Sequence, residues 1–302
     1  MLRNAGSNPL QNRGVPAQSA KRENLASAAY IGSQELNSKI YAIGDVHGRA
    51  DLLGSMIDFI GKHASRVGTE QRVFFLGDIV DRGPDSREAM EIVCETLTRW
   101  PQSQLLLGNH DCIFLDAMTS QRWVQRWFER LGGMQTLISY LGEGTHYFPE
   151  EIVAIGKRFP ELLEVLRAAP QYIAVGHYLF VHAGINPSVP LAEQDKNDLL
   201  QIRERFTDHV GALSHVVVHG HSPLSPPRPV VTENRISLDT EAWLTGVLSM
   251  AVIDTETDEI EFFATSSSGP VMAIDPAILD RGYGTALDAW KSGKPPQEQR
   301  TA

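Results

Sequence analysis

The chain has 302 residues, of which 42% are hydrophobic and 21% charged, with a formal net charge of −10 and a pI near 5.5. This length and composition are typical of an enzyme with a substantial core, built as one large domain or two small ones. The negative charge disfavours non-specific binding to nucleic acid or to an anionic membrane.

The chain has two cysteines, Cys94 and Cys112, and neither belongs to a Cys-x-x-Cys pair. A disulfide framework or a zinc site built from thiolates is therefore not expected. No apolar run approaches the roughly 20 residues that span a bilayer, and no continuous apolar stretch follows the basic residues near the N-terminus. We expect a cytoplasmic protein.

The two ends of the chain differ in composition from its middle. Residues 1–38 are rich in Asn, Ser, Gln, Ala and Gly and show no period of 2 or 3.6, which predicts a disordered tail. Residues 281–302 are polar and are expected to form a loose C-terminal tail. The segment 39–280 is then the folded domain.

Three strand, loop and helix units open this domain. Their predicted strands are Lys39–Ile43, Val73–Leu76 and Leu105–Leu107, and a polar loop containing glycine follows each one. Helical spacing follows each loop, most clearly from Ser86 to about Trp100, where Pro101 ends the helix. Such units predict an α/β sheet with polar groups along its carboxyl edge.

The middle of the domain is predicted to be helical over residues 119–169. A helical insertion between two polar loops fits a cap over a cleft, although its aromatic and leucine stripes fit an ordinary core even better.

Residues 172–175 and 178–181 are predicted to form a type II′ hairpin with Gly176 first in its loop. Three later strand-like runs, near residues 235–238, 247–254 and 260–265, suggest a second, mostly antiparallel sheet packed on the first.

Five short motifs with carboxylate, imidazole or carboxamide groups follow predicted strands. They are Gly-Asp-x-His-Gly from Gly44, Gly-Asp-x-x-Asp-Arg-Gly from Gly77, Gly-Asn-His-Asp from Gly108, His-Ala-Gly from His182, and Gly-His at Gly220. Mixed oxygen and nitrogen ligands suit manganese, iron or zinc, whereas an all-oxygen set would suit magnesium or calcium.

Two divalent ions are the economical number for these ligands, with manganese preferred and iron or zinc as alternatives. The first ion is expected to bind Asp45, His47 and Asp78, and the second to bind Asp78, Asn109, His182 and His221. Asp78 would bridge the two ions at the separation of roughly 3.5–4 Å that two-metal hydrolases use.

These motifs, spread from Tyr41 to Trp243, resemble those of the phosphoprotein phosphatase family of metallophosphoesterases, in its bacterial branch. The resemblance implies a calcineurin-like β-sandwich of two mixed sheets flanked by helices, and it implies the same metal ligands. It also implies that His110 donates a proton to the leaving oxygen and that Asp81 orients His110.

Arginines are expected to bind the phosphoryl group. Arg82 directly follows Asp81, and a guanidinium matches two phosphoryl oxygens. The segment 201–205 resembles the Arg-Glu element of phage and bacterial relatives, which favours Arg203 over Arg205 as the second phosphate ligand. The resemblance also favours His221 over His219 as the metal ligand.

The residues after His221 separate family branches, and Asp111 and Glu241 depart from patterns of the family, Asp111 as in bacterial and diadenosine-tetraphosphatase-like members. Ser222 and Pro223 follow His221 where broader metallophosphoesterases often have Gly-His-x-His, which favours a phosphatase over a phosphodiesterase or nuclease. Asp111 stands where eukaryotic members usually have Glu. Glu241 replaces the glycine of a bacterial Leu-Asp-Thr-Gly segment, and a carboxylate bordering the cleft would repel phosphorylated substrates.

The expected function is that of a phosphomonoesterase acting on phosphoserine or phosphothreonine, and on phosphotyrosine as a further option. A water shared by the two ions would attack phosphorus in line while His110 protonates the leaving oxygen. The partner would be a phosphorylated protein or small phosphoester, with no nucleic acid or membrane involved. The alternatives are a dinucleoside polyphosphate hydrolase and a non-catalytic interaction module.

Overall fold

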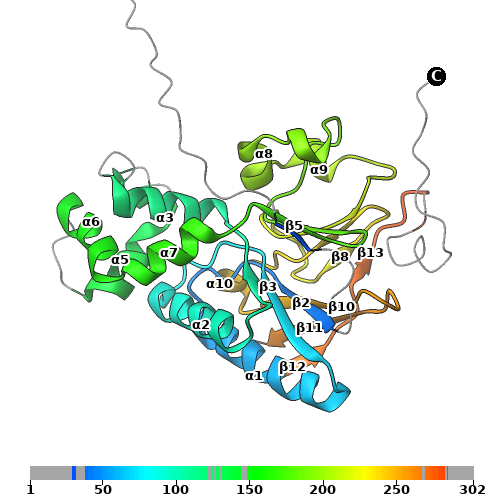
Figure 1. Cartoon of the computed structure of the whole chain (residues 1–302), viewed down its shortest axis with the longest axis horizontal. Coiled ribbons are helices and arrows are strands. Elements are labelled where there is room, and N and C mark those ends of the chain that lie inside the picture. Colours follow the sequence, from blue (N-terminus) through cyan, green and yellow to red (C-terminus); the bar gives the residue numbers. More distant parts are fainter. Residues whose placement is uncertain are drawn as a thin grey trace, which may run out of the picture.

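The computed structural model describes residues 29–31, 38–120, 124–125, 127–128, 131–143, 148–266, 269–282 and 284. These residues form two stacked β-sheets with helices on both outer sides (Figure 1). Among them, no helix is long and apolar enough to cross a membrane.

The first sheet contains the three predicted βα units. Its strand order is β12 (Gly269–Ala273), β11 (Ile260–Ser266), β10 (Ser249–Asp254), β2 (Ser38–Ile43), β3 (Glu70–Phe75) and β4 (Gln104–Leu105). Strands β2, β3 and β4 are parallel, and β10 to β12 extend the sheet in antiparallel fashion from β2. The carboxyl ends of β2, β3 and β4 therefore share one edge.

The second sheet contains the predicted hairpin. Its order is β1 (Ala29–Ile31), β5 (Tyr172–Val175), β6 (Tyr178–Val181), β7 (Val216–His219), β9 (Arg235–Ser237), β8 (Val230–Val231) and β13 (Ala277–Ile278). Strands β5 and β6 are antiparallel across a two-residue loop in which Gly176 has φ +57°, as a type II′ turn requires. Strands β6, β7 and β9 are parallel.

The strand pairing differs from the expected separate antiparallel sheet, and that expectation is wrong. Strand β9 joins β7 in the second sheet, while β10 pairs with β2 and so belongs to the first. Both sheets are mixed, as the family resemblance implies. The period of a strand reveals which face it buries but not which strand edge it joins, because the pairing partner lies far away in the chain.

Helices cover the outer face of each sheet. The helices are α1 (Ala50–Val67), α2 (Ser86–Arg99), α3 (Asn109–Thr119), α5 (Gly133–Leu141), α6 (Pro149–Arg158), α7 (Pro160–Ala168), α8 (Lys196–Gln201), α9 (Glu204–Thr207) and α10 (Ala242–Thr245), with a 3₁₀ turn at Leu191–Glu193. Helices α1 and α2 lie against the first sheet, and α8 and α9 lie against the second (Figure 1).

Alternation along the strands produces the layers. On β2, Tyr41 and Ile43 belong to the core shared with α1 and α2, whereas Ile40 and Ala42 face the second sheet. A strand buried on both faces reads as a continuous apolar run, which is why the run at Lys39–Ile43 predicts a strand so clearly.

The helical segment after α3 packs beside the first sheet. Helices α5, α6 and α7 contact α2 and α3, and their side chains Leu137, Ile155 and Leu166 are fully buried in the same core as the α1 side chains. Their apolar stripes are thus core residues.

The predicted tails lie mostly outside the described residues. Of residues 1–38, the structure describes 29–31 and Ser38, and residues 29–31 form β1, which pairs in parallel with β5. Of residues 281–302, it describes 281, 282 and 284.

The contact between the two sheets provides a test of the fold. Phe74 on β3 is fully buried and packs edge-to-face against Phe180 on β6, with the ring centroids 4.9 Å apart. We expect Phe74→Ala to lower the free energy of unfolding by about 3–5 kcal/mol, because the two sheets cannot close over the missing ring. Urea denaturation measures this loss, and Phe148→Ala, at a side chain 57% exposed, should change it by less than about 0.5 kcal/mol.

Candidate metal centre

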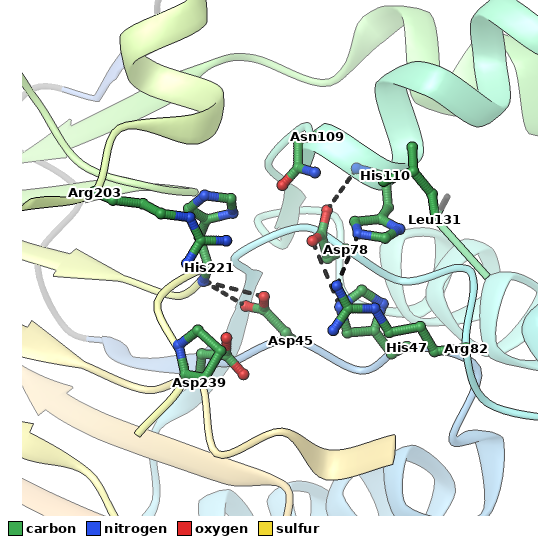
Figure 2. Close-up of a pocket in the computed structure, with 11 residues that line it drawn as sticks. Asp45, His47, Asp78, Arg82, Asn109, His110, Leu131, Arg203, His221 and Asp239 are labelled. Atoms are coloured by element: carbon green, nitrogen blue, oxygen red, sulfur yellow. Dashed lines mark hydrogen bonds and ion pairs between the residues drawn. The ribbon is translucent and has the colours of Figure 1, made fainter. Parts of the chain in front are cut away.

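The candidate residues converge where the carboxyl edges of the two sheets meet. A cavity of about 120 Å³ lies there (Figure 2). Its lining residues are Asp45, His47, Asp78, Arg82, Asn109, His110, Leu131, Arg203, His221, Pro223 and Asp239. The site is thus built from the loops after β2, β3, β4, β7 and β9, together with the α8–α9 connection.

Asp78 lies at the centre of the cluster and is 1% exposed (Figure 2). Its Oδ1 accepts a hydrogen bond from the backbone N–H of His110 at 2.9 Å and lies 3.4 Å from His182 Nε2. Its Oδ2 lies 3.6 Å from His47 Nε2. Burial disfavours the charged carboxylate, whereas positive charge on the neighbouring histidines would favour it and lower the pKa of Asp78.

Two histidines are oriented by carbonyl groups behind them. Nδ1 of His47 donates to Val80 O and Nδ1 of His182 donates to Leu76 O, both at 2.8 Å. The Nε2 atom of each ring therefore faces Asp78 with its lone pair. Burial lowers the pKa of both rings, that of His47 to about 3, so both are neutral at pH 7.

Several hydrogen-bond acceptors lie close together, and a bound cation would remove the repulsion between them. His182 Nε2 lies 2.9 Å from Oδ1 of Asn109, and the buried Nε2 of His221 has no hydrogen-bond partner among the described residues. Ligand atoms of Asp78, His182 and His221 all lie within 4.8 Å of one another. Unpaired nitrogen and carboxylate atoms at this spacing fit a divalent transition-metal ion.

A second group on the other side of Asp78 could also hold a metal. Its members are His47, Asp78 and His110, again with ligand atoms within 4.8 Å of one another. The sequence predicts Asp45 rather than His110 in this set. Asp45 lines the same cavity, and burial and the carboxylates of Asp239 and Asp78 raise its pKa well above the usual range, a repulsion that a bound cation would remove.

Glycines allow these groups to approach. The backbone N–H of His221 donates to both oxygens of Asp45, at 3.0 and 3.2 Å, and a Cβ on Gly220 would collide with that carboxylate. A Cβ on Gly108 would collide with the backbone and carboxylate of Asp78. The glycines of the motifs are thus required by space.

His110 is paired with Asp81, as the resemblance implies. Nδ1 of His110 lies 2.7 Å from Oδ2 of Asp81, and its Nε2 lies 3.3 Å from a guanidinium nitrogen of Arg82. Burial opposes the charged imidazole, but the carboxylates of Asp78 and Asp81 outweigh it and raise the pKa of His110. Burial raises the pKa of Asp81, against the hydrogen bonds that it accepts.

The structure separates the ambiguous pairs of the sequence. Arg203 lines the cavity, whereas Arg205 is 58% exposed and forms an ion pair with Asp198. His219 is fully buried and contacts Ser237 Oγ at 2.7 Å, outside the metal-ligand groups.

Asp111 fastens the loop after β3. Its carboxylate accepts hydrogen bonds from the backbone N–H groups of Ile79, Val80 and Gly108, at 2.9, 3.3 and 3.2 Å. Burial and the charge of Asp78 raise its pKa to about 7. This residue shapes the loop that carries Asp78 and Asp81.

Sequence reasoning missed four residues of the site. Asp239 lines the cavity, and burial raises its pKa to about 6. Leu131 also lines it, while Trp127 and Thr136 bind Asp81 from the helical segment. The Leu-Asp-Thr pattern could have pointed to Asp239, but no local pattern marks the other three.

The backbone conformation of Glu241 is one that favours glycine, the residue expected at this position. Its φ is +50°, in the left-handed region that glycine adopts most easily. Asp239 of the same loop lines the cavity, whereas Glu241 itself is not among the lining residues, and the repulsion of substrate by Glu241 stays a prediction.

The chain is similar in sequence to known phosphoesterases. The family model described as calcineurin-like phosphoesterase matches residues 38–246. The chain is 28% identical over 227 residues to serine/threonine-protein phosphatase 1 of Salmonella typhimurium, covering 71% of this chain and 91% of that protein. It is 27% identical over 262 residues to the asymmetrical bis(5'-nucleosyl)-tetraphosphatase PrpE of a Geobacillus species, covering 77% and 96%.

A solved structure shows the same fold. It is a protein serine/threonine phosphatase from Saccharomyces cerevisiae with similarity to human phosphatase PP5, with a TM-score of 0.53 and 13% identity over 80% of this chain and 84% of that one.

The central position of Asp78 predicts its effect on metal binding. We expect Asp78→Asn to bind less added manganese than the unmodified protein, because the change keeps the shape of the side chain but removes the charge that lies among four histidines. Mass spectrometry of the metal content after dialysis against manganese and gel filtration measures the loss. The control Asp58→Asn, at an exposed position on α1, should match the unmodified protein. An unchanged metal content in folded Asp78→Asn would contradict the central role of this carboxylate.

Proposed function

Because the chain belongs to the calcineurin-like phosphoesterase family, we propose that it is a metal-dependent phosphomonoesterase that dephosphorylates phosphoserine and phosphothreonine in proteins. The observation that carries the proposal is the paired His110 and Asp81 beside two arginines at the cavity with the candidate metal ligands. A non-catalytic module would have no use for such a buried acid and its orienting carboxylate.

We propose two divalent cations, with manganese preferred over iron or zinc, as the cofactors. Asp45, His47 and Asp78 would hold one, and Asp78, Asn109, His182 and His221 the other, with His110 close to the first. When bound, such cations activate a water as nucleophile and neutralise the charge on the phosphoryl group.

The remaining tasks fall to side chains of the chain itself. Arg82 and Arg203 line the cavity and would bind the phosphoryl oxygens. Nε2 of His110 lies beside the Arg82 guanidinium, so the same region of the cavity is reached by a phosphate-binding group and by a proton donor. His110 would protonate the leaving oxygen there, while Asp81 keeps its Nδ1 occupied.

The size of the cavity favours a small reacting group. About 120 Å³ lined mainly by charged and polar side chains, with Leu131 and Pro223 as the apolar members among the described residues, fits a phosphoryl group and its ions better than a nucleobase. This supports a phosphoester whose leaving group stays outside the cavity, such as a phosphorylated side chain of a protein.

Both cysteines are free thiols, which fits a reducing cytoplasm as the compartment.

A dinucleoside polyphosphate hydrolase is the second candidate. It is supported by the similarity to the Geobacillus bis(5'-nucleosyl)-tetraphosphatase, whose identity and coverage are close to those of the Salmonella phosphatase. The catalytic groups would serve both reactions, because each breaks a bond between phosphorus and oxygen.

A panel of substrates tests the choice. With manganese at neutral pH, we expect kcat/KM for phosphoserine and phosphothreonine peptides to exceed that for diadenosine tetraphosphate by at least about tenfold. A phosphotyrosine peptide is measured in the same panel. Phosphate release and nucleotide chromatography measure the two reactions. The reverse order would establish the second candidate, and inactivity of folded, metal-loaded protein on all substrates would refute both.

The role of His110 predicts a dependence on the leaving group. We expect His110→Asn to lower kcat for a phosphoserine peptide by about 10²-fold or more, because an alkoxide leaves poorly without a proton. The fall for p-nitrophenyl phosphate should be much smaller, since nitrophenolate leaves without protonation. Steady-state kinetics measure both, with His215→Asn as control. Equal losses for the two substrates would contradict proton donation by His110.

A further inference from the structure

The carboxylate of Asp81 is held by two side chains from the helical segment after α3. Asp81 is completely buried. Nε1–H of Trp127 donates to its Oδ1 and Oδ2, at 2.8 and 2.9 Å, and the hydroxyl of Thr136 donates to Oδ1 at 2.8 Å. His110 is the third donor to this carboxylate among the described residues, at 2.7 Å from Oδ2. The direction of this carboxylate is thus fixed by groups distant in the sequence.

Thr136 also fixes the backbone of Asp81. The same hydroxyl oxygen accepts a hydrogen bond from the Asp81 N–H at 2.9 Å, so it binds both the backbone and the side chain of one residue. Asp81 and Arg82 have φ values of +74° and +69°, which are strained backbone conformations for residues with a Cβ. The carbonyl of Gly132 accepts from the Arg82 N–H at 3.2 Å. The helical segment thereby stabilises the strained pair.

Trp127, Gly132 and Gly133 are closely packed against their neighbours. Trp127 is fully buried and its ring centroid lies 5.3 Å from that of Phe114. A Cβ on Gly133 would collide with the indole of Trp127, and one on Gly132 would lie 3.1 Å from the backbone nitrogen of Arg82. Trp127 and Gly132 therefore pack directly against Asp81 and Arg82.

We propose that Trp127 and Thr136 are positioning residues for proton transfer by His110. By fixing Asp81, they hold His110 with its Nε2 toward the cavity. The inference rests on the proposed function, in which a water loses one proton to the solvent and its oxygen bonds to phosphorus as the bond to the leaving oxygen breaks. The leaving oxygen keeps the electron pair and takes the proton from Nε2, while the Nδ1 proton stays hydrogen-bonded to Asp81.

Two substitutions test this role. Thr136→Val removes the bridging hydroxyl and roughly keeps the volume of the side chain, and Trp127→Phe removes the indole N–H but also shortens a fully buried ring. We expect kcat for phenyl phosphate to fall about tenfold or more, because phenolate is a poor leaving group. The value of kcat for p-nitrophenyl phosphate should fall less than about threefold, because nitrophenolate leaves without protonation. KM should stay within about twofold, and the manganese content should stay unchanged.

Conservative and matched variants separate positioning from general damage. Thr136→Ser keeps the hydroxyl and should restore most of the activity on phenyl phosphate. Thr96→Val is the matched control, because Thr96 is also buried but its hydroxyl donates to Ile92 O within α2. If Thr136→Val folds poorly by circular dichroism, Trp127→Phe supports the same comparison.

A double-mutant cycle decides whether the effect passes through His110. In the His110→Asn background, adding Thr136→Val or Trp127→Phe should cause no further fall in kcat for phenyl phosphate. A full additional fall, or equal falls on both aryl phosphates in the single variants, would overturn the inference. Inactivity of the unmodified, manganese-loaded protein on both substrates would instead contradict the proposed function.

Discussion

The site depends on one buried carboxylate, Asp78, that faces more acceptors than donors. A charged group with almost no exposure is costly unless it is paired. His110 N–H supplies one hydrogen bond, but the facing Nε2 atoms of His47 and His182 carry lone pairs because their Nδ1 atoms already donate to carbonyls. The protein alone leaves this arrangement incomplete, and a cation between these atoms would complete it.

The loops around Asp78 are held in strained conformations. Among the described residues, seven other than glycine have positive φ, and five of them belong to the site: His47, Asp78, Asp81, Arg82 and His221. Each such residue costs roughly 1–3 kcal/mol unless its surroundings compensate. Here the compensation is visible in the backbone N–H groups bound by Asp111 and in the contacts of Gly132 and Thr136 with the Asp81–Arg82 pair. Strain is concentrated where side chains must point into one small cavity.

The sequence predicts the parts of the site that local patterns encode. A continuous apolar run followed by glycine and a polar residue predicts both a buried strand and the position of a side chain at its carboxyl end, as for Asp78 after β3. Spacing within the hairpin predicts its turn in the same way. The pairing of β10 with β2 could not be predicted, because many edges can accept a strand with the right faces. The presence of His110 in one metal-ligand group could not be predicted either, because its distance from His47 depends on how two loops pack.

The network around Asp81 shows why apolar patterns can hide functional residues. Trp127 and Thr136 lie at helical spacing among large apolar side chains, and both are fully buried, so any reading by period places them in the core. That placement is correct but incomplete, because an indole N–H and a hydroxyl in a core need acceptors. Here the acceptor is the carboxylate that orients His110. The same burial that makes these residues look structural shields the carboxylate from water, which strengthens each of its hydrogen bonds. The helical segment therefore belongs to the hydrophobic core and to the site at once.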